Sequence, residues 1–220
     1  HDPGPQRGPG TGGVQQELTK PMKNIPAAQW CRVFLKQQVR PGDLCIDATA
    51  GNGYDTEFLC SLTGEKGRVL AFDIQEQALE QTRQRLERAG YAGRASLILQ
   101  GHEHMADYAR EGTVSAAVFN FGYLPGGDHR LATRPETSLK ALEAALGLLK
   151  EGGILCLCLY SGGDTGYAEK QALMDWLEKL DEKAYLAVRC QYCNRNKDAP
   201  LPVLVVKLRQ YPCTQPSILL

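Results

Sequence analysis

The sequence predicts an α/β fold in which a seven-stranded, mostly parallel sheet has helices on both faces. Strand-like and helix-like segments alternate about five times along the 220-residue chain. The strand-like segments are largely apolar without strict alternation, as expected of strands buried on both faces. The last two strand-like segments are separated by only eight residues, too few for a crossover helix. These two strands should therefore be antiparallel, which leaves one antiparallel strand in the sheet.

The first half of the chain supplies an opening helix and three strand–helix units. The helix is expected over residues 26–39, where Trp30, Val33 and Phe34 have the spacing of an apolar helical face. Asp55 is placed to cap the first helix after a strand. The expected strands are residues 43–49, 67–74 and 95–100, and the helices are residues 55–62, 75–90 and 103–110.

The second half continues the alternation and then ends on two strands. Pro135 lies near the first turn of one expected helix, a position that proline favours. The expected strands are residues 114–120, 152–160, 184–192 and 201–209, and the helices are residues 134–150 and 167–180. No internal repeat or linker divides the chain. A single domain over residues 20–213 is therefore expected, with a Pro/Gly-rich leader at 1–19 and a tail at 214–220.

Composition narrows the classes of partner. Lys plus Arg and Asp plus Glu number 25 each, so the formal net charge is zero. Attraction of the whole molecule to nucleic acid or membrane has no support, and any basic surface must be local. No apolar stretch approaches the ~20 residues that cross a bilayer, so no membrane partner is predicted.

The cysteines favour a reducing, cytoplasmic location. Most of the eight lie within apolar runs, where a free thiol behaves as a small hydrophobic group. Cys190 and Cys193 have CxxC spacing, but no second pair or nearby histidine completes a zinc set. No metal site is predicted.

A glycine turn, "DATAGNG" at residues 47–53, follows the first strand and opens the next helix. Ligands of such sheets bind beyond the carboxyl ends of the strands, and Gly51 and Gly53 would let the backbone approach one closely. A dinucleotide would want a third glycine and a bare helix N-terminus. Thr56 and Asp55 stand at those positions, and a pyrophosphate would be repelled by the carboxylate. The turn thus disfavours NAD, although a turn without a ligand stays open.

A cationic cofactor without phosphate fits the turn better. S-adenosylmethionine carries a sulfonium, an amine and a ribose diol. Asp73 ends the second strand, 20 positions after Gly53, where a carboxylate can accept hydrogen bonds from both ribose hydroxyls. Such charge-assisted bonds contribute about 1.5–3 kcal/mol each. Asp47 and Asp55 would add negative potential. Alternatively, Asp73 caps the following helix, and one residue can do both.

Several motifs together resemble a known family. "IDATAGNGYDT", "AFDIQEQAL", "GHEHM", "FNFGYLPGGD" and "LLKEGGIL" occur in this order and look like the small bacterial class I methyltransferases named "putative rRNA methylase". That family is associated with methylating the 5-aminomethyl group of the wobble (2-thio)uridine in tRNA. The resemblance covers roughly residues 24–209. It implies a Rossmann-like methyltransferase fold, S-adenosylmethionine as cofactor and an RNA substrate bound by its tRNA anticodon region; homodimer formation stays open.

The resemblance also implies which residues hold the cofactor. They match the family's loops after the first three strands. The set is Asp47, Gly51, Asn52, Gly53, Asp55, Thr56, Asp73, Ile74, Gln75, His102 and Glu103. His102 is expected on the adenine side, with a general-base role as the alternative.

The stretch after the fourth strand would carry the chemistry. Asn120-Phe121-Gly122-Tyr123 has the spacing of the Asn/Asp-Pro-Pro-Tyr motif of amino-group methyltransferases. The Asn120 carbonyl oxygen would orient the amine, and Tyr123 or Phe121 would stack on the uracil. Asp128 would accept the amine proton, or else be only a turn residue.

Two loops differ from the family pattern, and other functions stay open, so the RNA substrate is not fixed by the sequence. Residues 161–170 lack a histidine found in the family, and residues 194–200 differ from its late loop. Basic clusters could contact phosphates or simply face solvent. They comprise Lys20, Lys23, Arg32, Lys36 and Arg40; His129, Arg130 and Arg134; and Arg195 with Lys197. An rRNA, small-molecule or protein N-methyltransferase, and a non-catalytic SAM- or RNA-binding module, remain alternatives.

Overall fold

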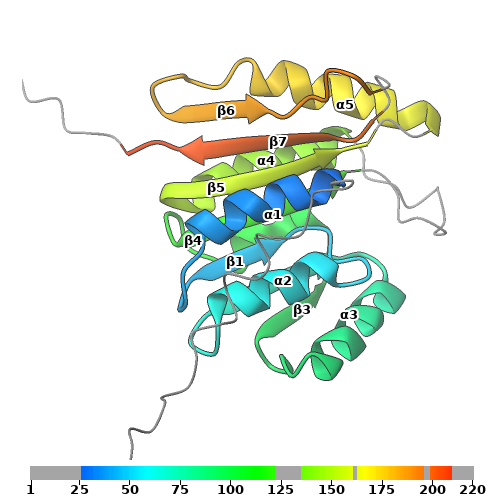
Figure 1. Ribbon diagram of the computed structural model, residues 1–220, viewed down its shortest axis with the longest axis vertical. Coiled ribbons are helices and arrows are strands. Elements are labelled where there is room, and N and C mark those ends of the chain that lie inside the picture. The colour runs from blue at the N-terminus through cyan, green and yellow to red at the C-terminus, as the bar shows by residue number, and fades with distance from the viewer. Residues whose placement is uncertain (1–25, 122–134, 161–162, 196–198, 210–220) are drawn as a thin grey trace, which may run out of the picture.

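The computed structural model describes residues 26–121, 135–160, 163–195 and 199–209, which form one seven-stranded sheet flanked by helices (Figure 1). The strands are β1 (Leu44–Asp47), β2 (Arg68–Asp73), β3 (Ala95–Leu99), β4 (Val114–Phe121), β5 (Leu149–Leu159), β6 (Tyr185–Arg189) and β7 (Leu201–Lys207). The helices are α1 (Ala27–Gln38), α2 (Tyr54–Thr63), α3 (Glu76–Arg88), the 3₁₀ helix η2 (His102–Asp107), α4 (Pro135–Leu148) and α5 (Gly163–Leu177).

The sheet has the order β3-β2-β1-β4-β5-β7-β6. Strands β3, β2, β1, β4 and β5 pair in parallel, whereas β7 is antiparallel to both β5 and β6. The prediction of one antiparallel strand in a mostly parallel sheet is confirmed. Its cause is the short β6–β7 connection, which reverses the chain within one edge of the sheet.

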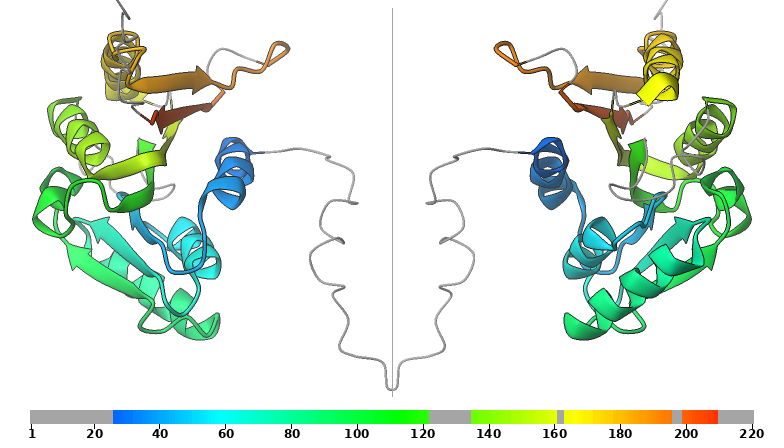
Figure 2. Two further views of the ribbon diagram at one scale, coloured as in Figure 1. Left: turned by 90° about the vertical axis from the view of Figure 1, so that its left-hand side faces the viewer. Right: turned by 90° about the vertical axis from the view of Figure 1, so that its right-hand side faces the viewer.

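Helices cover both faces of the sheet, as predicted (Figure 2). The side chains of successive strand residues therefore point to opposite faces of the sheet and pack in two different hydrophobic cores. Cys45 packs with α1 and α2, whereas its neighbour Ile46 packs with η2, α4 and α5. Since both faces are dry, the strands carry continuous apolar runs. Within the described residues, no helix has the length and apolarity to span a bilayer.

Helix α1 packs through a different face from the one predicted. Its buried side chains are Ala27, Cys31 and Leu35, spaced by four residues. Val33 and Phe34, which were expected to face the core, are 49% and 38% exposed. The pattern was misleading because two of the three buried residues, Ala27 and Cys31, have small side chains that do not stand out as an apolar face.

Helix α2 begins one residue earlier than expected. Gly53 is its N-cap residue and Tyr54 its first residue, so Asp55 lies inside the first turn and makes no capping hydrogen bond. The prediction that Asp55 caps this helix is wrong. The segment expected as a short helix at 103–110 is the 3₁₀ helix η2.

The cysteines in the described part are all free, and five of them are buried. Burial raises the pKa of Cys45 to about 12 and that of Cys60 to about 11. Thiols with such pKa values stay protonated and unreactive at neutral pH. The burial of five of these side chains agrees with the prediction that most cysteines lie in apolar surroundings.

The glycine turn packs directly on α3. Gly53 has a φ of +78°, and a Cβ there would lie 2.8 Å from the Cα of Thr82. The Thr82 hydroxyl donates to the Gly51 carbonyl oxygen at 3.1 Å. Gly53 is therefore needed for backbone conformation and for contact with α3, and close approach of this turn to a ligand stays a prediction.

Replacing Gly53 with Ala should destabilise the fold more than replacing Gly90. Both glycines have positive φ, but a Cβ at Gly90 meets nothing within 4 Å. Gly90→Ala should cost about 1–2 kcal/mol for its conformation. Gly53→Ala should cost about 1–3 kcal/mol more because it also overpacks. Urea unfolding of the two variants measures the difference, and equal losses would contradict the packing role.

Candidate active site

The candidate site lies where the chain order of the sheet reverses. Strands β1 and β4 are neighbours, and the chain proceeds outward from them in both directions. In open α/β sheets this switch point, at the carboxyl ends of the strands, is where ligands bind. The loop after β1, Asp73 at the end of β2 and Asn120 near the end of β4 all lie at this edge, on the right in Figure 1.

Asp47 supports the glycine turn from beneath. Its side chain is fully buried; one oxygen accepts the Thr49 amide N–H at 3.1 Å and the other the Thr56 hydroxyl at 2.6 Å. Burial, reinforced by the nearby Asp55 charge, raises the pKa of Asp47 to about 7. Thr56 is likewise fully buried. The structure thus places two predicted cofactor residues under the loop, where they fix its shape.

Asp73 has the free acceptor capacity that a ribose diol requires. One carboxylate oxygen accepts the Gly51 amide N–H and the other the Gln75 amide N–H, each at 2.9 Å. A carboxylate offers about four lone-pair sites, so each oxygen can accept one more bond. Ile74 follows directly and is 55% exposed, which provides an apolar surface beside the carboxylate. Helix α3 begins only at Glu76 with Gln75 as its N-cap residue, so Asp73 is not its cap.

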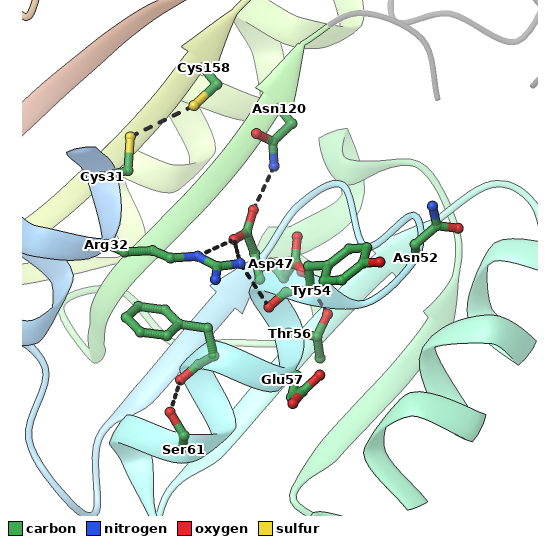
Figure 3. A network of polar contacts seen from close by, with 12 residues as sticks. Cys31, Arg32, Asp47, Asn52, Tyr54, Thr56, Glu57, Ser61, Asn120 and Cys158 are labelled. Atoms are coloured by element: carbon green, nitrogen blue, oxygen red, sulfur yellow. Dashed lines mark hydrogen bonds and ion pairs between the residues drawn. The ribbon is translucent and has the colours of Figure 1, made fainter. Parts of the chain in front are cut away.

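Asn120 is oriented by a charged network. Its side-chain N–H donates to Asp55 Oδ2 at 2.9 Å, and its backbone N–H donates to the Thr49 hydroxyl at 2.8 Å. Arg32 of α1 binds Asp55 Oδ1 through Nε and Nη2, at 3.2 and 2.9 Å. Figure 3 shows Arg32 reaching toward this carboxylate from the left and Asn120 from above. Because the amide nitrogen of Asn120 is engaged, its carbonyl oxygen remains as the acceptor.

A second arginine secures the start of α2. Arg85 forms an ion pair with Glu57 at 3.1 Å, donates to the Asn52 carbonyl oxygen at 2.7 Å, and lies 3.6 Å from the centre of the Tyr54 ring. The first turn of α2 thus carries two carboxylates, Asp55 and Glu57. A diphosphate at this helix end would displace or face them, which supports the sequence argument against NAD.

His102 lies under the site rather than in it. The side chain is buried against Phe119 and Phe121, at ring distances of 5.8 and 6.1 Å, and Nδ1 is 3.3 Å from the Ala48 carbonyl oxygen. Burial lowers its pKa, so the ring is neutral at pH 7. This position favours a supporting role over general-base catalysis. Glu103, in the first turn of η2, is partly buried beside it.

Phe121 cannot stack on a substrate base in this structure. It is 2% exposed and stacks on Phe119 with ring centres 5.2 Å apart. The prediction that Phe121 could stack on the uracil is wrong, because its side chain belongs to the core. Tyr123 and Asp128 lie outside the described residues, and their roles stay predictions.

Sequence reasoning missed the residues that hold the predicted ones in place. These are Arg32, Thr49, Thr82 and Arg85. Thr49 could have been suspected from its place in the glycine turn. Arg32 precedes its partner by 23 residues, and no local pattern links the two.

Comparison with known proteins shows the family to which the chain belongs. The family model described as "Putative rRNA methylase" matches residues 69–206. The chain belongs to this family. It is 34% identical over 84% of its length to the "tRNA (mnm(5)s(2)U34)-methyltransferase, chloroplastic" of Arabidopsis thaliana, of which the match covers 69%.

Solved structures agree in fold and sequence. The crystal structure of a putative rRNA-methylase from Clostridium thermocellum has a TM-score of 0.81 and 40% identity, covering 84% of this chain and all of that one. SMU.1697c, a putative methyltransferase from Streptococcus mutans solved in complex with SAH, has a TM-score of 0.75 and 35% identity, covering 84% and 99%. This rRNA methylase family member is therefore an S-adenosylmethionine-dependent methyltransferase.

The residues present fit S-adenosylmethionine. Asp73 retains one acceptor position on each oxygen for the ribose diol, and Ile74 offers an apolar surface for the adenine. The carboxylates of Asp55 and Glu57 suit a cofactor that is cationic and lacks phosphate. In this family member, Asp73, Ile74 and the turn at residues 50–53 would hold the cofactor.

Asp47→Asn should change how stability depends on pH. An unfolded Asp has a pKa of about 3.9, whereas that of Asp47 in the fold is about 7. The stability that the protonated Asp47 side chain contributes to the fold is therefore fully present below about pH 4. It is lost as the pH rises toward 7. Asn keeps a donor for Thr56 and an acceptor for Thr49 but never ionises.

Relative to wild type, the Asp47→Asn variant should gain up to about 1.4 kcal/mol per pH unit across this window. Urea unfolding at several pH values measures the gain. Gln29→Ala, at an exposed position of α1, removes no titratable group. It is the control and should show a constant difference. A constant difference for Asp47→Asn as well would contradict the raised pKa.

Proposed function

We propose that this protein methylates an amine on RNA, namely the 5-aminomethyl group of the wobble (2-thio)uridine in tRNA. The observation that carries the proposal is the 34% identity, over 84% of the chain, to a plant protein named as a tRNA (mnm(5)s(2)U34)-methyltransferase. The family description as an rRNA methylase supports RNA as the substrate class. An rRNA, a small amine or a protein amine would be the alternative acceptors.

Asn120 is the residue best placed to orient the amine. Its nitrogen donates to Asp55, so its carbonyl oxygen can accept an N–H of the substrate and direct the nitrogen lone pair. S-adenosylmethionine, when bound, supplies an electrophilic methyl group. The reaction is a direct displacement in which the new C–N bond forms as the C–S bond breaks, so positioning provides most of the rate.

Asp55 and Arg32 act on the reaction through Asn120. Arg32 holds Asp55 with two N–H groups, and Asp55 in turn holds the amide. They are positioning residues, since neither needs to contact the substrate. Tyr123 is proposed to stack on the uracil and Asp128 to accept the proton that the amine loses. Both assignments rest on the sequence motif.

Mass spectrometry of tRNA nucleosides tests the function. Undermodified tRNA that carries aminomethyl-uridine is incubated with the enzyme and S-adenosylmethionine labelled on the methyl group. We expect the label on the aminomethyl nitrogen at the wobble position. Label on rRNA alone, or none on either RNA while a small or protein amine is methylated, would exclude the tRNA assignment.

Asn120→Ala should slow methyl transfer without weakening cofactor binding. Loss of one preorganised polar contact to the reacting group typically costs about 10²-fold in kcat. Asn120 lies on β4, away from Asp73, so the Kd for S-adenosylmethionine should stay within about twofold, well below the ~1.4 kcal/mol of a tenfold change. Single-turnover kinetics and calorimetry measure the two quantities separately.

The control for Asn120→Ala is Gln84→Ala. Gln84 is exposed on α3 and, among the described residues, its hydrogen bonds lie within its own helix, so its removal should leave both quantities unchanged. A normal rate for Asn120→Ala would remove Asn120 from the mechanism. If the rate falls only because the affinity for S-adenosylmethionine falls, Asn120 would be assigned a role in cofactor binding instead.

A further inference from the structure

A basic pocket lies beside the carboxyl end of β6 and the start of β7, two strands beyond β4 in the sheet order. It has a volume of about 240 Å³, and its lining includes Lys170, Arg189, Gln191, Tyr192, Arg195 and Leu201. These residues come from α5, the end of β6, the segment after it and the start of β7. None of the residues described above at the candidate active site lines this pocket.

The pocket is close to the catalytic asparagine in the sheet. Phe121, the residue after Asn120, is paired with Leu159 of β5, and Leu159 is paired with Leu201 of β7. Adjacent strands lie about 4.8 Å apart, so the pocket wall begins roughly 10 Å from the end of β4. Because β7 is antiparallel, its start shares an edge with the carboxyl ends of β4, β5 and β6 (Figure 1).

The lining is positive and partly fixed. Among the described residues, the lining has three basic side chains, those of Lys170, Arg189 and Arg195, and no Asp or Glu. This concentration stands out in a chain whose formal net charge is zero. The Tyr192 hydroxyl accepts a hydrogen bond from the Trp30 indole N–H at 3.1 Å. That bond ties the pocket wall to α1, the helix whose Arg32 holds the catalytic network.

We propose that this pocket binds a backbone phosphate of the RNA strand that carries the target nucleotide. The proposal rests on the proposed RNA substrate and adds the place where its backbone docks. Guanidinium groups recognise phosphate oxygens through paired N–H bonds. Contacts to phosphate fix the register of a nucleic acid without reading its sequence. A phosphate held here would set how far the neighbouring base reaches toward Asn120.

Single charge-removing variants at the pocket test the proposal. Arg189→Gln and Arg195→Gln should each raise the KM for the tRNA substrate about tenfold, the loss expected for one charge-assisted contact. Each should also reduce the slope of log Kd against log salt by about 0.7, the value for one single-strand phosphate contact. The kcat at saturating tRNA and the Kd for S-adenosylmethionine should not change, which also verifies that the variants fold.

Lys66→Gln is the matched control. Lys66 is an exposed lysine just before β2, at the amino ends of the parallel strands and so opposite the pocket. Its replacement removes the same charge. We expect it to leave the KM and the salt slope at their wild-type values. An effect of Lys66→Gln equal to that of the arginine variants would show general charge attraction and overturn the pocket assignment.

The outcomes separate this proposal from the proposed function. If the wild type methylates tRNA while both arginine variants keep its KM and salt slope, the pocket assignment fails and the function stands. If the wild type transfers no methyl group to any RNA, the proposed function fails and the phosphate assignment fails with it. Weakened binding confined to the pocket variants supports both.

Discussion

The site depends on one carboxylate, that of Asp55, which Arg32 and Asn120 share. It connects three elements that are far apart in sequence, since Arg32 lies on α1, Asp55 on α2 and Asn120 on β4. The ion pair is only 30% and 14% exposed at its two side chains, so solvent screens it less than a surface pair. Without Arg32, a largely buried charge would lose its compensation, which generally costs several kcal/mol. The orientation of the Asn120 amide follows from this pair.

Burial, followed by the nearby charge of Asp55, raises the pKa of Asp47 to about 7. Two carboxylates lie close together beneath and beside the glycine turn, and like charges in a dry environment do not both ionise readily. Arg32 compensates Asp55, while Asp47 is fully buried and accepts hydrogen bonds from Thr49 and Thr56. Asp47 therefore fixes the glycine turn, while Asp55, held by Arg32, orients Asn120. The division of labour between the two acids comes from their partners.

The sequence predicted features that depend on local pattern and connection length. The apolar strands predicted a buried sheet, and the short link before residue 201 predicted the antiparallel pair. The places where strands end predicted that Asp73 and Asn120 lie at the site. It failed where side chains from distant elements meet. The buried face of α1 is formed by the small residues Ala27 and Cys31, and Phe121 turns into the core. Periodicity cannot reveal a partner such as Arg32, because the pairing exists only once α1 packs beside β4 and β5.

Net neutrality conceals a division of charge along the catalytic edge. In the half formed by β1, β2 and α2, Asp55 and Glu57 are paired with Arg32 and Arg85. Asp73 accepts hydrogen bonds from backbone N–H groups and is the carboxylate that suits the ribose of a cationic cofactor. The half formed by β6, β7 and α5 carries Lys170, Arg189 and Arg195 around its pocket. An anionic strand held at the second half would stay clear of the acids at the first, while its base extends across β5 toward Asn120. If the pocket holds the RNA backbone as proposed, the sheet would bind a cationic cofactor and a polyanion at separate places along the carboxyl ends of its strands.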